Sequence, residues 1–124
     1  MESIGLVRVS AYSRNMENIN EFQTSLLNNE ASLRVWRAFI QADARNLGDL
    51  DDTRLNLMVL TTFRNYENAY FARVYGQMGE KEWERFERNI CRNFDNARAA
   101  SRQSLLADVL TEEFMQYIVE FCSE

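Results

Sequence analysis

The stretch from Phe63 to Gly76 reads FRNYENAYFARVYG and holds five aromatic residues together with two arginines, a glutamate and two asparagines. On a helical wheel of about 100° per residue, the apolar side chains here and on either side of this stretch form one broad face. This face consists of Val59, Leu60, Phe63, Tyr66, Tyr70, Val74 and Met78. The other side or its margin holds Arg64, Asn65, Asn68 and Ala72. The pattern therefore predicts a long amphipathic helix over about residues 51–78.

Glu67 interrupts this pattern, because it falls inside the apolar face, as does Asn56. A carboxylate buried without a partner takes up a proton instead of keeping its charge. We expect Arg37, on the preceding helix, to bind Glu67, since a guanidinium can hold a carboxylate through two parallel hydrogen bonds. Arg64, three residues before Glu67, is the local alternative.

A polar network is expected around Glu67 and Arg37. Its further members are Asn68, Tyr70, Tyr66 and Arg73. In a structural interpretation the network fixes the register of the second and third helices, because breaking a buried pair costs about 3–5 kcal/mol. In a functional interpretation the same residues line a pocket for a small polar ligand.

The rest of the chain also shows helical periodicity, broken by short loops. The further expected helices cover about residues 7–27, 31–46, 81–94, 95–108 and 112 onward. Asp49 or Asp51 is expected to cap the long helix, Asp95 or Asn96 the fifth, and Thr111 the last. With no proline and only four glycines, the chain favours helices over strands. We expect a single all-α domain over residues 1–124, an irregular up-and-down bundle of five to six helices around the long third helix.

Composition argues against most catalytic and cofactor chemistry. The absence of histidine removes Ser-His-Asp catalysis and the usual zinc sites. The aspartates at 49, 51 and 52 lack the glycine and closing glutamate of a calcium loop, and no glycine-rich phosphate loop occurs. We therefore expect no enzymatic activity, no metal and no cofactor. The net charge of −5 disfavours nucleic acid as a partner.

The two cysteines and the amino-terminal segment bear on the compartment. Cys91 and Cys122 are expected to be free thiols packed as small hydrophobes, with a disulfide between their helices as the alternative. No segment reaches the roughly 20 apolar residues of a membrane span. The best candidate, IGLVRVSAY at residues 4–12, is too short and is broken by Arg8.

Several motifs occur in a recognisable order. They are Ser10-Ala11-Tyr12, Leu33, Trp36-Arg37, Phe63, Glu67-Asn68, Tyr70, Gly79, Glu82-Trp83-Glu84 and Thr111-Glu112-Glu113-Phe114. This order resembles a widespread, uncharacterised group of small bacterial helical proteins, over nearly the whole chain beyond about Val9. In that group a single membrane-spanning helix usually precedes the matching region, which implies a helical domain displayed at the inner membrane. The chain departs from the group at residues 95–102, DNARAASR, where proline-glycine and tryptophans are usual.

Two functions are consistent with these observations. The leading expectation is a non-enzymatic interaction or scaffold domain that binds a protein partner or itself, in the cytoplasm or at the cytoplasmic face of the inner membrane. Leu57 and Tyr75 lie off the main apolar face and are the candidates for its outer patch, or for contact with a second packed neighbour. The alternative is a sensor of a small polar ligand, with a solvent-connected pocket around Glu67 and Arg37.

Overall fold

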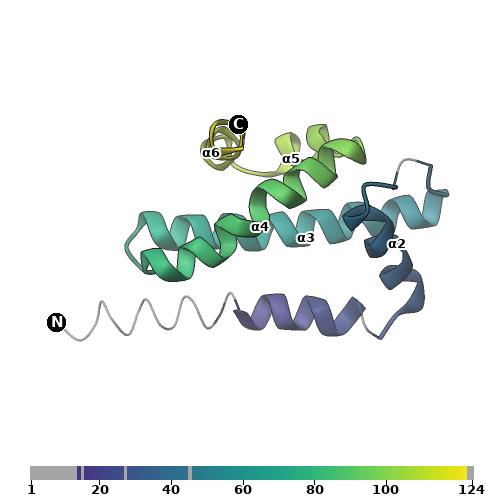
Figure 1. Cartoon of the computed structure of the whole chain (residues 1–124), viewed down its shortest axis with the longest axis horizontal. Helices are drawn as coiled ribbons and strands as arrows, with labels where there is room; N and C mark the ends of the chain where they lie inside the picture. Colours follow the sequence, from purple (N-terminus) through teal and green to yellow (C-terminus); the bar gives the residue numbers. More distant parts are fainter. Residues whose placement is uncertain (1–13, 15, 27, 45, 123–124) are drawn as a thin grey trace.

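A computed structural model describes residues 14, 16–26, 28–44 and 46–122, and all regular structure in that part of the chain is helical (Figure 1). A helix over residues 16–26 is followed by α2 (Glu30–Ile40), α3 (Asp49–Val74), α4 (Glu80–Ala99), α5 (Gln103–Val109) and α6 (Glu112–Phe121). The expected all-α bundle around a long third helix is confirmed. The expected first helix extended to residue 7, and residues 1–13 lie outside the described part.

The 26-residue α3 forms the centre of the bundle and packs against α2, α4 and α5. In Figure 1 the 16–26 helix and α6 lie on opposite sides of α3 and α4. Leu55, Val59 and Phe63 of α3 are fully buried. The largest fully buried side chains of the other helices are Phe39, Trp83, Phe94 and Phe114.

Neighbours on several sides of α3 change which of its residues are buried. Asn65 and Ala72, expected on the outer side, are only 8% and 7% exposed. Both line hollows shared with the 16–26 helix, which covers that side. Val74, expected in the core, is 48% exposed at the end of the helix. A wheel with one apolar face assumes one neighbouring layer, and α3 has more than one.

Three helices end in the same backbone motif, at positions that differ from the expected boundaries. Ala42, Gly76 and Ser101 have positive φ angles of 55°, 73° and 59°. The residue after each donates its backbone N–H to a carbonyl five residues back, as in a Schellman motif. Consequently α2 ends at Ile40 rather than Asn46, and α4 continues to Ala99.

Two expected caps are wrong and one is confirmed. Asp95 and Asn96 lie inside α4 and begin no helix. The N-cap of α3 is Gly48, and the aspartates lie in its first turn. Thr111 does cap α6, since its hydroxyl accepts a hydrogen bond from the backbone N–H of Phe114 at 3.3 Å.

Cys91 and Cys122 form a disulfide, with their Cα atoms 5.3 Å apart. The expectation of free thiols is therefore wrong, and the alternative holds. The cause is the packing of α6 on α4, which brings the end of α6 against the middle of α4. The sequence places both cysteines on apolar helices but does not show which helices touch.

Candidate functional site

The environment of Glu67 differs from the expected one. Its half-buried carboxylate accepts a hydrogen bond from the backbone N–H of Thr111 at 2.7 Å. Arg37 is exposed on α2 and forms no ion pair within the described part of the chain. The expected Arg37–Glu67 pair is wrong, because Glu67 faces the start of α6 and not α2. The N–H groups there lack helical partners and carry partial positive charge, so they suit a carboxylate.

The other expected network residues are not brought together at Glu67. Arg64 and Asn68 lie exposed on the solvent side of α3. Tyr70 instead packs beneath α6, with its ring centroid 5.3 Å from that of Phe114. Burial raises the pKa of Tyr70, and the nearby charge of Glu113 adds to this effect.

Arg73, the last expected member, serves a different contact. Its guanidinium pairs with Glu80 at 3.0 Å and lies over the ring of Trp83, 5.6 Å from the centroid. The hydrogen bond that Arg73 donates to the Glu80 carboxylate raises the pKa of Arg73, although partial burial opposes this. Arg73 therefore connects the end of α3 to the start of α4 and makes no contact with Glu67.

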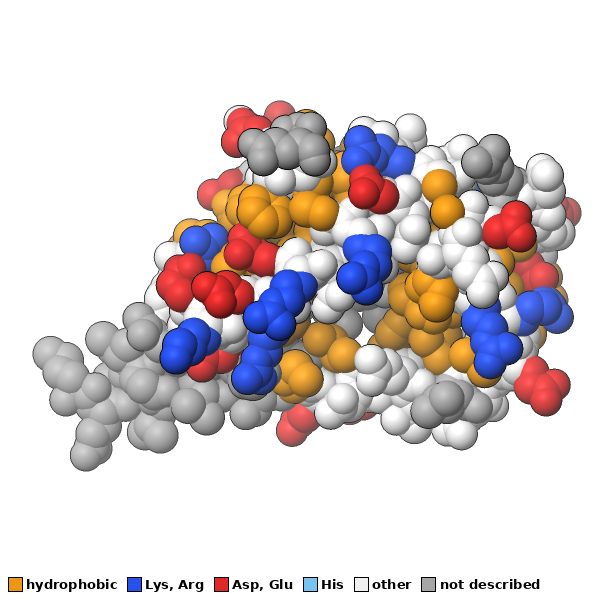
Figure 2. All heavy atoms as spheres, in the orientation of Figure 1, with side chains coloured by type: hydrophobic (Ala, Val, Ile, Leu, Met, Phe, Trp, Pro, Cys, Tyr) orange, Lys and Arg blue, Asp and Glu red, His pale blue; other side chains and the backbone are white. Residues whose placement is uncertain are grey.

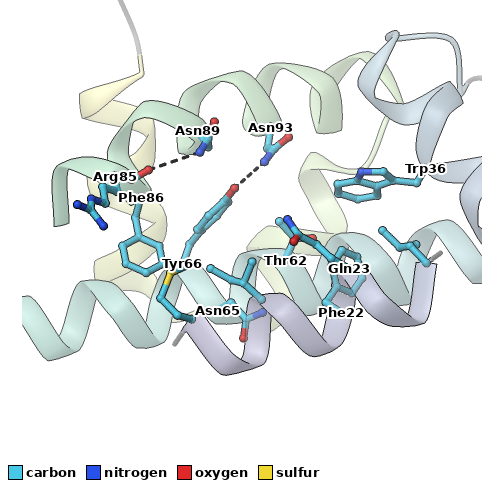
Figure 3. A pocket seen from close by; sticks show the side chains of 13 residues that line it. Phe22, Gln23, Trp36, Thr62, Asn65, Tyr66, Arg85, Phe86, Asn89 and Asn93 are labelled. Atoms are coloured by element: carbon cyan, nitrogen blue, oxygen red, sulfur yellow. Dashed lines mark hydrogen bonds between the residues drawn. The ribbon is translucent and has the colours of Figure 1, made fainter. Parts of the chain in front are cut away.

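A cavity of about 410 Å³ lies elsewhere, between the 16–26 helix, α3 and α4 (Figure 3). Apolar side chains are visible in the hollow between these helices, with basic side chains beside it (Figure 2). The cavity is lined by Met16, Ile19, Phe22, Gln23, Leu26, Trp36, Thr62, Asn65, Tyr66, Arg85, Phe86, Asn89 and Asn93. Ligand pockets commonly measure about 300–1,000 Å³ and combine apolar walls with a few polar groups, as this one does.

The polar groups of this cavity are almost all uncharged. The Tyr66 hydroxyl accepts a hydrogen bond from the Asn93 amide at 2.6 Å, across the space between α3 and α4 (Figure 3). The phenol of Tyr66 is neutral at physiological pH, and burial raises its pKa further above the ordinary value of 10.0. Among the thirteen described residues of the lining, Arg85 alone is charged and none is a carboxylate.

Asn65 is a nearly buried carboxamide of the cavity lining. It is 8% exposed, and its side-chain amide forms no hydrogen bond to another residue of the described chain. Its amide atoms are not among the fully buried atoms without a partner, so water in the cavity can reach them. A molecule bound in the cavity would replace that water as the hydrogen-bond partner of Asn65.

Sequence reasoning did not identify this site, although one signal was available. Asn89 and Asn93 are four residues apart, so both lie on one face of α4, and Phe86 is beside them on that face. The amide of Asn93 is directed toward Tyr66, whereas that of Asn89 donates to the backbone carbonyl of Arg85, as Figure 3 shows. The described residues of the lining offer hydrogen-bond donors and acceptors but no thiol or carboxylate. These groups suit the binding of a ligand more than catalysis.

Comparisons with protein-family models, with curated proteins and with solved structures each gave no match. The resemblance to small bacterial helical proteins therefore stays a prediction. Within residues 14–122, apart from positions 15, 27 and 45, no helix combines the length and apolarity needed to cross a bilayer. The same residues contain no cluster of three or more His, Cys, Asp or Glu side chains placed to bind a metal ion.

Proposed function

We propose that this domain binds a small amphipathic molecule, neutral or singly anionic, in the cavity between the 16–26 helix, α3 and α4. The observation that carries the proposal is the composition of the wall, which pairs apolar side chains with carboxamides, a phenol and one arginine. The domain recognises this molecule and does not transform it. This is the sensor function expected from the sequence, moved from Glu67 and Arg37 to a different face of α3.

Charge supports a neutral or anionic ligand. The chain carries 19 acidic and 14 basic residues, yet no acidic residue of the described part lines the cavity. A cation would therefore lose its hydration without gaining a counter-charge, which is costly. Arg85 can pair with a carboxylate or phosphate through its fork of N–H donors.

The ends of the cavity differ, which gives the ligand a preferred orientation. Figure 3 places Arg85 at one end and Trp36 at the other, with Tyr66, Asn89 and Asn93 between them. Trp36 and Phe22 form an edge-to-face aromatic pair, with ring centroids 5.4 Å apart. The ligand would place its charged or polar group at Arg85 and its apolar body against this pair.

Binding of matched compounds tests the proposal. Isothermal titration and thermal unfolding would compare aromatic and long-chain aliphatic carboxylates with their amides and with amines of the same skeleton. We expect carboxylates to bind most tightly, amides next and amines least. Arg85→Ala should remove the advantage of carboxylates over amides, while Arg88→Ala, an equal charge change on an exposed part of α4, should preserve it. Equal binding of amines and carboxylates would contradict the proposal.

A second candidate is the interaction domain, and the outer side of α3 favours it. Leu50, Leu57 and Tyr75 are 65%, 62% and 72% exposed. Because they are separated by multiples of a helical turn, they form one line along the helix. A protein partner or a second copy of the chain would cover this line. Analytical ultracentrifugation of the wild type and of Leu57→Lys tests self-association, which the substitution should weaken.

The compartment is also a proposal. A cytoplasmic location, or one at the cytoplasmic face of the inner membrane, is supported by the resemblance alone. The proposed location has to be consistent with the disulfide between Cys91 and Cys122, and lasting disulfides are rare in the cytosol. A disulfide that is reversibly reduced and reoxidised as the protein functions would be compatible with a cytoplasmic location.

A further inference from the structure

Helix α6 is fastened to the rest of the bundle at both ends. At its start, the Glu67 carboxylate accepts a hydrogen bond from the backbone N–H of Thr111. At its end, the C-cap residue Cys122 is bonded to Cys91 of α4. The first fastening is a hydrogen bond and the second is covalent. Of the two, only the covalent one can be opened by a redox reaction.

An aromatic cluster lies beneath α6. Trp83 of α4 is fully buried there, and the Tyr117 ring covers it with a centroid distance of 5.9 Å. Tyr70 lies 4.8 Å from Tyr117, measured between ring centroids. The hydroxyl of Tyr117 donates a hydrogen bond to Glu87 of α4 at 2.5 Å. Displacing α6 would uncover the indole of Trp83 and the ring of Tyr70.

The intrinsic stability of α6 is low. The helix has ten residues, fewer than the roughly 12–15 that an isolated helix needs to be even marginally stable in water. Val119 and Phe121 on its outer side are 47% and 44% exposed, so only part of its apolar surface is buried. Its position therefore depends on Phe114 and Ile118 in the core and on the two end fastenings.

We infer that the Cys91–Cys122 disulfide is a redox-controlled latch, and that its reduction by a dithiol frees α6 from α4. Both cysteines are only half-buried, so a reductant has access to the bond. One thiolate of the dithiol attacks a sulfur of the bond and forms a mixed disulfide, and the other chain sulfur leaves as a thiol. The second thiol of the reductant then displaces the remaining cysteine. The two cysteines gain two electrons and two protons, and the reductant becomes a disulfide.

Hydrogen exchange with and without dithiothreitol tests this inference. The bond closes a segment of 31 residues, so its loss should speed amide exchange in α6 by roughly a hundredfold. Exchange in α3 should accelerate much less than exchange in α6. In the double variant Cys91→Ser with Cys122→Ser, α6 should exchange fast with or without reductant.

Three outcomes would overturn the inference. They are unchanged exchange in α6 on reduction, equal acceleration in every helix, and free thiols in protein purified without reductant. Fluorescence gives an independent measure, because the chain has two tryptophans and Trp36→Phe leaves only Trp83. Its emission should shift to the red on reduction as the indole becomes hydrated, and a constant spectrum would also reject the latch.

Discussion

The carboxylate of Glu67 accepts a hydrogen bond from the backbone N–H of Thr111 at 2.7 Å, which joins α3 to the N-cap residue of α6. This contact explains why a charge lies in the most aromatic stretch of the chain. The start of a helix offers unpaired N–H groups and a partial positive charge, so a carboxylate from a neighbouring helix satisfies both. Glu67 therefore acts as a cap supplied from a residue 44 positions away in sequence.

Glu67→Ala should lower the free energy of unfolding by about 1–2 kcal/mol, because helix caps and charges at helix ends contribute about this much. Glu67→Gln keeps an acceptor oxygen and should lose about half of that. Asn68→Ala, next to it and exposed, is the control and should change stability by less than about 0.5 kcal/mol. Urea unfolding measures all three, and an equal loss in Glu67→Ala and Asn68→Ala would contradict the capping role.

Alkaline pH should destabilise the fold through its buried phenols. Burial raises the pKa of Tyr66 and Tyr70 above the ordinary value of 10.0. For Tyr117, burial comes first, and the hydrogen bond to the Glu87 carboxylate raises the pKa further. A raised pKa in the folded state gives stability that is complete below the unfolded value and is lost as pH rises toward the folded value.

Urea unfolding between pH 8 and pH 11 should therefore show a decline in stability that begins near pH 10, the ordinary tyrosine pKa. Tyr117→Phe should make this decline shallower, because it removes a phenol held beside a carboxylate. Tyr75→Phe is the matched control, since its ring is 72% exposed. If stability is constant to pH 11, or if both variants flatten the decline equally, the role of the buried phenols is wrong.

The order and number of helices followed from the sequence because apolar spacing is a local property. Helix ends were harder, since Ala42 and Ser101 take the left-handed conformation that the sequence rules assign to glycine or asparagine. The continuation of α4 through Asp95 and Asn96 had the same cause. No glycine or asparagine in the sequence marks the C-terminal end of α4, and the helix ends because the backbone of Ser101 takes a positive φ angle.

The candidate site was harder to predict than the fold. A wheel correctly placed Glu67 on an inward side of α3 but could not show which helix covers that side. It also placed Asn65 outward, because the 16–26 helix as a second neighbour is not visible from α3 alone. A cavity depends on where helices fail to meet, and that is a tertiary property. Local sequence patterns identify the polar side chains that line the cavity, but they do not show that side chains from different helices meet there.

Glycine at the end of α2 should stabilise the protein. The left-handed conformation costs an ordinary residue about 1–2 kcal/mol, so Ala42→Gly should raise the free energy of unfolding by up to about 1 kcal/mol. The reverse change, Gly76→Ala at the end of α3, should lower it by a similar amount. A methyl group at Gly76 meets no other atom, so the cost is conformational alone. Opposite shifts in thermal midpoint are expected, and a loss in Ala42→Gly would contradict this account.

Asn65→Leu should separate stability from ligand binding. The two side chains are similar in volume, and leucine removes an amide that has no protein partner but is reached by solvent, which should stabilise the fold by up to about 1 kcal/mol. The same change removes a hydrogen-bonding group from the cavity wall, so carboxylates and amides should bind at least tenfold more weakly, the effect of about 1.4 kcal/mol. Proteins commonly trade stability for function at such positions.

The matched control for Asn65→Leu is Asn96→Leu on α4. Asn96 is 9% exposed, its side-chain nitrogen also lacks a partner, and it does not line the cavity. Asn96→Leu should therefore gain stability without any change in ligand binding. Calorimetric titration and urea unfolding of both variants give the comparison. If both variants bind equally well, Asn65 is a feature of packing, and the ligand site proposed between the 16–26 helix, α3 and α4 loses its best-supported polar contact.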